Sequence, residues 1–556
     1  MKKKYLQKVL AACLMGVMAV GTLTGCGGDG TKAAHVSVAT NDVAGIAGYT
    51  AFENTVTLKI PVYDRGQEGV PAIGTGDNYW EGWIQENFGA KYNIDVQFVP
   101  ITRTAVLESY NLLAADKNLP TILMEYDFPK QAQWAGEGFL ATYDLDEFAN
   151  IAPTYYKRMQ DLDQIKYTKM NDNTFFVLAE RPYYNTNYTF VTWYRMDWLK
   201  QVGYDHIPAN RAEYVDAMTK IQQAGISAHP AGGIMTTGTA GLDQNYAYRQ
   251  YPTDEKEWAM YGDYAIPSLG WEPNKQLLKR ANEDFNLGFT DPEYFTIDAA
   301  TSEANFVNGK NYSYSAYIAA DMPVLKSFYE NNPNAELAIG IQNNVEDTAN
   351  GSVPAFRSNN PFGMMIGFSS QATSDEVKAA WMYMEWMLQE ENLLTMQWGN
   401  EGEHFNYVNG LPVSVGDYSG DKKQGFNNNK DYWCVAIEAR NAGTIEDVIA
   451  AASPKGLPQD FTQDLITNYY NQVAAWEKGW VPTDCMFATQ IEAVDEYQQT
   501  LLTKYAELRD KLVMCKPEEF DALYETYTKE YQDAGYKAIT DERLKAFEEG
   551  MSSRMQ

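Results

Sequence analysis

Hydrophobic side chains alternate at the start of the part of the chain that we expect to fold. In residues 55–63 every second side chain is apolar, a period of two that predicts a strand. The next apolar residues recur at helical spacing up to Gly89, and residues 93–101 alternate again. A second helical segment, 105–116, leads to a short apolar strand at 121–128. This order of strands and helices predicts an α/β fold with a parallel sheet covered on both faces.

The ends of these strands are the first place to look for a ligand site. In open parallel sheets, ligands bind beyond the carboxyl ends of the strands. We therefore expect ligand contacts from Asn78 and Trp80, some way beyond the first strand, and from Tyr126 and Asp127, directly after the third.

Further elements follow along the chain. Residues 175–178 and 189–194 are β-rich, and Asn210 is placed to cap a helix that ends at Gly225. The clearest helix is 374–397, with an apolar face and a capping box at its start. Residues 491–549 are charged and helical in pattern. We find no internal repeat.

The amino terminus has the pattern of an export signal. A basic start and the apolar run 9–22 lead to Leu-Thr-Gly-Cys at 23–26, which predicts a lipoprotein signal peptide over 1–25 and acylation of Cys26. An ordinary secretory peptide with a chance cysteine is the alternative. Residues 26–54 are rich in small and polar side chains and predict a flexible linker, so that folding begins near Thr55.

Charge, length and cysteine content narrow the function classes. The chain of 556 residues carries a net charge of −30, and loss of residues 1–25 leaves 40 basic and 74 acidic residues. Such a charge disfavours nucleic acid and anionic lipid as partners. The length predicts two or more lobes, and no later apolar run is long enough to span a membrane. Cys434, Cys485 and Cys515 have no metal-site spacing and leave one disulfide or none open.

Aromatic residues supply the candidate binding chemistry. Aromatics make up 13% of the chain, and sugars present apolar C–H faces that stack on such rings. Rings that fall on a helical stripe, such as Trp83, Phe88 and Trp381, are assigned to the core. Core packing is also the alternative for rings in aperiodic segments. The candidate ligand-binding residues, which lie in such segments, are Asn78, Trp80, Tyr126, Asp127, Tyr183, Tyr184, Arg249, Trp271 and Trp398.

One loop raises the question of catalysis. Residues 398–412 hold two glutamates and a histidine among glycines, which could form an active site. A catalytic pair would need a nucleophile or a metal, and no such partner is indicated nearby. We interpret Glu401, Gly402 and His404 as structural residues of a loop that follows a helix. We also find no catalytic or cofactor motif, and residues 161–169 start like a calcium loop but lack its later ligands.

Four segments, taken in order, resemble a known family. They are residues 119–148, 193–214, 304–316 and 398–407, the last with Phe405 where the family usually has Tyr. The chain resembles family 1 extracellular solute-binding proteins, the substrate-binding lipoproteins of carbohydrate ABC transporters, and is most similar to their long Gram-positive members.

The resemblance implies a fold and a function. It implies a periplasmic-binding-protein-like architecture, in which two α/β lobes joined by hinge crossovers close on a ligand in the cleft between them. Lobe one would comprise residues 55–178 and 310–367. Lobe two would comprise residues 179–309 and 368–556, with a C-terminal helical extension.

It also implies partners and a location. The protein would be a monomer without cofactor or metal, lipid-anchored at the extracellular face of the cell membrane. It would bind an oligosaccharide and deliver it to the permease subunits of an ABC importer, without enzymatic activity. A secreted glycan-cleaving enzyme, a sensory or adhesive lipoprotein, and a binder of peptides or small charged solutes through Arg249 or Arg357 remain alternatives.

Overall fold

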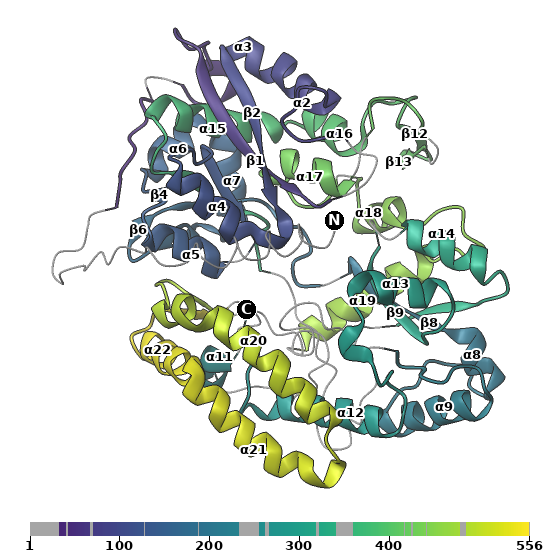
Figure 1. Cartoon of the computed structure of the whole chain (residues 1–556). Coiled ribbons are helices and arrows are strands. Elements are labelled where there is room, and N and C mark those ends of the chain that lie inside the picture. Colours follow the sequence, from purple (N-terminus) through teal and green to yellow (C-terminus); the bar gives the residue numbers. More distant parts are fainter. Residues whose placement is uncertain are drawn as a thin grey trace, which may run out of the picture. The chain divides into compact units, whose positions relative to one another are not determined.

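A computed structural model describes most of the chain (Figure 1). The described residues are 33–40, 43–66, 71–126, 128–186, 188–232, 255–261, 266–318, 322–340, 360–415, 418–423, 426–440, 442–478 and 485–554. The compact unit to which the elements below belong begins at Ala34.

The first sheet contains the predicted amino-terminal strands. β1 (Val56–Asp64) and β2 (Ile94–Thr102) pair in parallel over their whole length. β3 (Ile122–Glu125) begins beside β1, because the backbone N–H of Thr121 donates to the carbonyl oxygen of Lys59 at 3.0 Å. The three predicted strands and the parallel pairing of the first two are confirmed. α4 (Val106–Ala115) confirms the predicted helix between β2 and β3.

A late segment of the chain completes this sheet. β11 (Met365–Ser369) pairs antiparallel with β3, with β4 (Leu140–Ala141) and with β7 (Phe176–Leu178). All five residues of β11 are buried, as a central strand requires. β3, β4, β7 and β11 thus form a four-stranded sheet in which β11 runs opposite to the other three. This sheet adjoins the parallel β1–β2 pair through the Thr121–Lys59 hydrogen bond, and we call the two together the first sheet.

Helices from the second half of the chain pack on the first sheet. α15 (Ser374–Met387) and α17 (Phe426–Cys434) both contact β1. The rings of Phe98 on β2 and Tyr432 on α17 meet edge to face, with centres 5.0 Å apart. These contacts place α15 and α17 with the first sheet.

The long helix predicted over 374–397 is two helices. The capping box predicted at its start is present, and α15 ends at Met387. Gln389 has an extended backbone (ψ 134°) and precedes α16 (Glu390–Trp398). The apolar residues continue through this break, so their periodicity does not reveal it.

The second sheet has three antiparallel strands. β8 (Phe190–Arg195) lies between β9 (Ser313–Tyr317) and β10 (Leu337–Gly340). Its core also receives side chains from α14 (Met322–Asn331) and α19 (Thr462–Glu477).

These pairings differ from the predicted lobe boundaries. Residues 310–340 were assigned to lobe one, yet β9 and β10 pair with β8 of the range assigned to lobe two. α15 and α17 fall in the range assigned to lobe two, yet they pack on the first sheet. The physical reason is that alternation in a strand shows which face is buried and does not show which strand lies beside it.

The carboxyl-terminal helices form a core of their own. α20 (Glu492–Met514), α21 (Phe520–Tyr531) and α22 (Lys537–Glu548) share this core with Ala259, Ile266, Leu269 and Leu278, the last of which lies in α12 (Glu272–Asn286) (Figure 1). The predicted helical character of residues 491–549 is confirmed.

Part of the predicted linker is packed on the folded body. Val36 and Val38 are 7% and 2% exposed, and the backbone N–H of Val36 donates to the carbonyl oxygen of Thr142 at 2.9 Å. The ring of His35 lies 3.0 Å from the Thr142 hydroxyl. At the described residues 35–38 the chain is packed, unlike the flexible linker predicted for residues 26–54. Burial of the alternating valines explains the difference.

In the part of the chain that the structure describes, no helix is both long and apolar enough to cross a membrane. Cys434 and Cys515 are free thiols.

Candidate ligand-binding site

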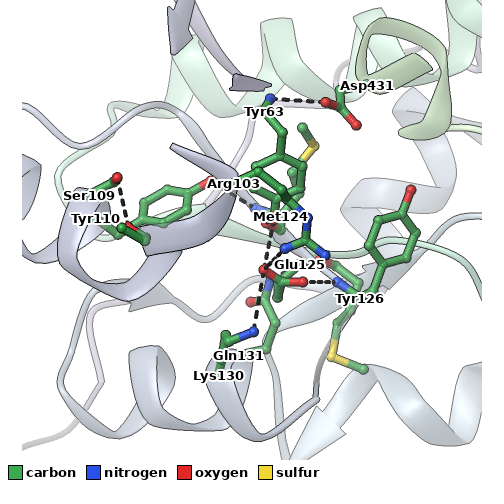
Figure 2. A network of polar contacts seen from close by, with 12 residues as sticks. Tyr63, Arg103, Ser109, Tyr110, Met124, Glu125, Tyr126, Lys130, Gln131 and Asp431 are labelled. Atoms are coloured by element: carbon green, nitrogen blue, oxygen red, sulfur yellow. Dashed lines mark hydrogen bonds and ion pairs between the residues drawn. The ribbon is translucent and has the colours of Figure 1, made fainter. Parts of the chain in front are cut away.

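Charged and aromatic side chains gather where the strands of the first sheet end. Arg65 follows β1, Arg103 follows β2 and Tyr126 follows β3. Carboxyl ends of parallel strands lie at one edge of a sheet, and binding sites of open α/β sheets form there. Figure 2 shows Arg103 and Tyr126 together with the buried residues that hold this edge. We call these three residues, together with the side chains that contact them, the strand-end cluster; the further members are Tyr63, Glu125, Lys130, Arg181, Lys430, Asp431 and Glu438.

Tyr63, the next-to-last residue of β1, connects three elements of the cluster. Its hydroxyl lies 2.7 Å from the carbonyl oxygen of Met124 and 2.9 Å from the Glu125 carboxylate, and these two acceptors share its single proton (Figure 2). Its backbone N–H donates to Asp431 on α17 at 2.9 Å. Burial, followed by the charge of Glu125, raises the pKa of the Tyr63 hydroxyl well above its usual value. The phenol is therefore a neutral donor.

Two buried carboxylates anchor the basic residues. The Asp431 side chain is fully buried and receives Arg65 through two contacts, at 2.6 and 3.0 Å. The Glu125 side chain is 1% exposed, with Arg103 at 3.3 Å and Lys130 of α5 (Phe128–Gly136) at 3.8 Å. A two-pronged guanidinium–carboxylate contact fixes the orientation of the arginine.

Cations also lie over both tyrosine rings of the cluster. The guanidinium carbons of Arg65 and Arg103 lie 5.3 and 4.7 Å from the centre of the Tyr63 ring. Arg181 lies 5.6 Å and Lys430 lies 5.4 Å from the centre of the Tyr126 ring. These distances fall within the range of cation–π attraction.

Three segments that leave the first sheet meet beside the cluster. Ala179, just after β7, donates its backbone N–H to the carbonyl oxygen of Met364, just before β11, at 2.9 Å. Glu180 donates to the carbonyl oxygen of Ala436 at 2.9 Å and accepts from the N–H of Glu438 at 2.8 Å. The chain passes between the first and second sheets at each of these three places. The segments are thus placed side by side, as hinge strands would be.

The strand-end cluster is suited to binding rather than to catalysis. Burial raises the pKa of the Cys434 thiol to about 12, which leaves it protonated and a poor nucleophile. The Glu438 carboxylate forms an ion pair with Arg181. Although burial opposes it, the charges of Arg181 and Lys430 lower the pKa of Glu438, so this acid holds no proton to donate at neutral pH. Among the described residues, no three His, Cys, Asp or Glu side chains are grouped closely enough to hold a metal ion.

No protein-family model and no curated protein matches the sequence. Several solved structures match the fold. The alginate-binding protein AlgQ2, crystallised without calcium ion, is 16% identical with a TM-score of 0.57, over 90% of this chain and 99% of that one. An extracellular solute-binding protein from Bifidobacterium longum subsp. infantis is 12% identical with a TM-score of 0.62, over 90% and 100%. The S. pneumoniae ABC-transporter substrate-binding protein FusA, an EF-hand mutant in complex with fructo-nystose, is 13% identical with a TM-score of 0.57, over 89% and 99%.

The chain has the solute-binding-protein fold. The expected α/β fold class is confirmed.

Within the solute-binding-protein fold, three tryptophans predicted as ligand contacts are core residues. Trp80, Trp271 and Trp398 are 0%, 5% and 1% exposed. The indole N–H of Trp80 donates to the carbonyl oxygen of Lys423 at 3.0 Å, and that of Trp271 donates to Glu257 at 2.6 Å. The structure does not support ligand contacts for these rings. Trp80 lies on α2 (Tyr79–Ile84) and Trp398 ends α16, so both rings belong to buried faces of helices.

Asn78 is also structural. Its side-chain oxygen accepts from the backbone N–H of Trp80 at the start of α2 (Tyr79–Ile84), and its amide donates to the hydroxyl of Tyr432 at 3.1 Å. With both ends of the buried amide engaged, Asn78 serves as a helix cap. Asp127 and Arg249, with Arg357 of the alternative, lie outside the described residues.

The remaining predicted rings are partly accessible. Tyr183 and Tyr184 are half-buried and follow the Ala179–Arg181 segment. The ring of Tyr184 meets Trp476 of α19 edge to face, with centres 6.0 Å apart. Tyr126 belongs to the strand-end cluster, where cations cover its ring.

His404 has the structural role expected of it in the glycine-rich loop, residues 398–412. Its Nδ1 accepts from the backbone N–H of Asn400 at 3.0 Å, and its Nε2 lies 2.8 Å from the carbonyl oxygen of Lys422. A Cβ on Gly399 (φ 85°) would lie 2.5 Å from the His404 ring, so glycine is required there. The Glu401 side chain is exposed. Gly402 adopts a φ of 79° in the turn.

The sequence analysis missed most of the strand-end cluster. The basic residues Arg65, Arg103 and Arg181 and the carboxylate of Asp431 were not among its candidates. Arg65 and Arg103 stand directly after predicted strands, and that position is a signal in the sequence. Asp431 carries no such signal, because its partner on β1 is more than 360 residues away.

Proposed function

We propose that the protein is an extracellular solute-binding protein that binds an oligosaccharide and passes it to the permease subunits of an ABC importer. The observation that carries this proposal is the fold match over about nine-tenths of the chain to binding proteins. Among these, AlgQ2 is described as alginate-binding and FusA was solved with fructo-nystose. The protonated thiol of Cys434 and the ion-paired acids of the strand-end cluster favour binding over cleavage.

We propose a revised division into two lobes. Lobe one contains the first sheet with α15 and α17, and lobe two contains the second sheet with α19. The three hydrogen-bonded segments at Ala179–Arg181, Gly363–Met364 and Ala436–Glu438 are the hinge. Short segments that pass between lobes side by side can change their backbone angles together, which is how such proteins close on a ligand.

Within this proposal, Tyr184 and Trp476 are the sugar-stacking residues. Both are half-buried, so part of each ring remains accessible, in contrast to Trp80, Trp271 and Trp398. Both residues lie beyond the hinge segments, on the side of the second sheet, whereas the strand-end cluster lies at the end of the first sheet. An aromatic pair on one side and hydrogen-bond donors on the other suit a ligand with C–H faces and hydroxyl groups.

The proposal also includes a lipid anchor that holds the protein at the membrane. The Leu-Thr-Gly-Cys sequence at 23–26 supports acylation of Cys26, which lies outside the described residues. Replacement of Cys26 by Ala should release the protein from the membrane fraction and abolish palmitate labelling, whereas Cys515→Ala should change neither. Retention of Cys26→Ala in the membrane would refute the anchor.

Binding is tested by titration and by analysis of products. Oligosaccharides of two to six units, neutral and acidic, are screened by thermal shift, and the best one is titrated while tryptophan fluorescence is followed. Trp476→Ala should weaken binding at least tenfold, about 1.4 kcal/mol, whereas Tyr407→Ala on an exposed hairpin should not. Turnover of the sugar that survives repurification would assign an enzyme instead, and binding of no sugar would overturn the proposal.

A further inference from the structure

We propose that a strap at the start of the folded chain fixes lobe one, rather than lobe two, to the membrane. The strap comprises the described residues 34–40 and 43–54. This inference rests on the lipid anchor of the proposed function and names the lobe to which that anchor is attached. Among the described residues, the hydrogen bonds that join the strap to the rest of the chain all go to lobe one.

The first part of the strap lies beside the end of β4. The backbone N–H of Val36 donates to the carbonyl oxygen of Thr142 at 2.9 Å, and the N–H of Thr142 donates to the carbonyl oxygen of Ala34 at 2.8 Å. The N–H of Val38 donates to the Glu147 carboxylate at 2.7 Å, and both valines are buried. Backbone pairing and burial of apolar side chains therefore both hold this part in place.

The second part of the strap contacts two helices of lobe one. The hydroxyl of Tyr49 donates to the carbonyl oxygen of Ile151, which ends α6 (Leu145–Ile151), at 2.7 Å. The N–H of Phe52 donates to the carbonyl oxygen of Tyr92, which ends α3 (Ala90–Tyr92), at 3.0 Å. The rings of Tyr49 and Tyr92 meet edge to face, with centres 5.7 Å apart. Because α6 contacts α15 and α3 contacts β2, both helices belong to lobe one.

The strap shortens the part of the chain that can act as a leash. Chain geometry limits the span from Cys26 to Ala34 to about 28 Å, at about 3.5 Å for each residue. Without the strap, the chain from Cys26 to Thr55 could span up to about 100 Å. An anchor at Cys26 therefore keeps the start of the strap, and lobe one with it, close to the lipid. Lobe two is joined to this point through lobe one and the hinge.

The test measures which lobe lies nearer to the lipid. The lipidated protein, with Cys485→Ala and Cys515→Ala, is reconstituted in phosphatidylcholine vesicles that contain an acceptor-labelled lipid. A donor dye is attached to one introduced cysteine, either Asp146→Cys on α6 or Ala212→Cys on α9 (Arg211–Gln223), both at exposed positions. α9 belongs to lobe two, because it packs against β8 and β10. We expect energy transfer to the lipid to be higher from Asp146→Cys than from Ala212→Cys.

A double substitution locates the effect in the strap. Val36→Asp with Val38→Asp places two charges at buried positions, so it should free the strap and lower the energy transfer from Asp146→Cys. Val408→Asp, the same substitution at an exposed position at the end of β12 (Phe405–Val408), is the matched control and should leave the transfer unchanged. The melting temperatures of both variants are compared with that of the wild type.

A longer leash tests the same attachment without touching the strap. An insertion of about twenty Gly and Ser residues between Cys26 and Ala34 adds flexible length. It leaves every contact of the strap in place, so the protein should fold as the wild type does. We expect the insertion to lower the energy transfer from Asp146→Cys, because lobe one can then move away from the lipid.

The outcomes separate this inference from the proposed function. Equal or higher transfer from Ala212→Cys, or transfer from Asp146→Cys that the insertion leaves unchanged, would overturn attachment through lobe one while the lipid anchor stands. Protein that does not sediment with the vesicles would overturn the lipid anchor and this inference together. Oligosaccharide binding is titrated separately, so its failure would overturn the binding function and leave this inference standing.

Discussion

Asp431 joins α17 to the end of β1, and its charge can be removed with little change of shape. Asp431→Asn keeps an oxygen that can accept the backbone N–H of Tyr63. It replaces the other carboxylate oxygen with an amide nitrogen, which cannot accept from Arg65. The substitution therefore tests the ion pair and largely spares packing.

The magnitude follows from the geometry of the pair. The two contacts, at 2.6 and 3.0 Å, join a fully buried acid to a guanidinium whose side chain is 14% exposed. Unit charges about 4 Å apart attract by about 4 kcal/mol at an effective dielectric constant of about 20. Breaking a buried pair typically costs about 3–5 kcal/mol. Since Arg65 keeps some contact with water, we expect Asp431→Asn to lower the free energy of unfolding by about 3 kcal/mol.

The assay is urea unfolding followed by tryptophan fluorescence, with a double-mutant cycle. Asp431→Asn, Arg65→Gln and the double variant give the coupling energy of the pair, which should exceed about 1.5 kcal/mol. Asp161→Asn, which breaks an exposed pair with Lys157, is the control and should leave the unfolding midpoint almost unchanged. A loss below about 1 kcal/mol in Asp431→Asn, or a coupling energy near zero, would show that the pair does not hold α17 to β1.

Three further changes have outcomes that the structure determines. His404→Ala should lower the free energy of unfolding by about 1–3 kcal/mol without changing sugar affinity, because both ring nitrogens contact backbone groups; loss of binding at unchanged stability would instead place His404 in the site. Cys434 should resist a thiol reagent at pH 8 in the folded protein. Its pKa is raised by burial from 9.0 to about 12, so the folded state keeps a proton that the unfolded state loses, and stability should fall as pH rises from 9 towards 12. Cys434→Ala should make this fall less steep, and an equally steep fall would contradict the assignment. Calcium should not raise the melting temperature beyond the effect of sodium chloride at equal ionic strength, since Asp161 and Asp163 pair with lysines; a saturable rise would show a calcium site.

The first sheet was predictable because its information is local. Residues 55–63 and 93–101 alternate, and the structure places β1 and β2 there within one residue. The capping box at Thr373 was readable for the same reason, since its two hydrogen bonds join residues three apart.

Partner choice was not predictable, because it depends on residues far apart. Nothing in residues 313–317 specifies β8 as a neighbour, and nothing in α17 specifies that Asp431 accepts from Tyr63. The loss of helix at Gln389 is of the same kind, since the apolar residues on both sides of the break are buried in the same core. Such choices are made by the packing of the whole chain.

The tryptophans and the arginines show which signal in the sequence pointed to the site. Trp80 was assigned to an aperiodic segment, yet it lies on α2 and its ring is buried against His404, more than 300 residues away. Absence of periodicity shows that a ring does not belong to a regular stripe, and it does not show that the ring is exposed. The positions of Arg65 and Arg103 are stronger evidence for a ligand site, because each residue directly follows a strand whose direction the βαβ order fixes. A long, basic side chain at that position must lie at the sheet edge, so the position of the strand already locates its charge.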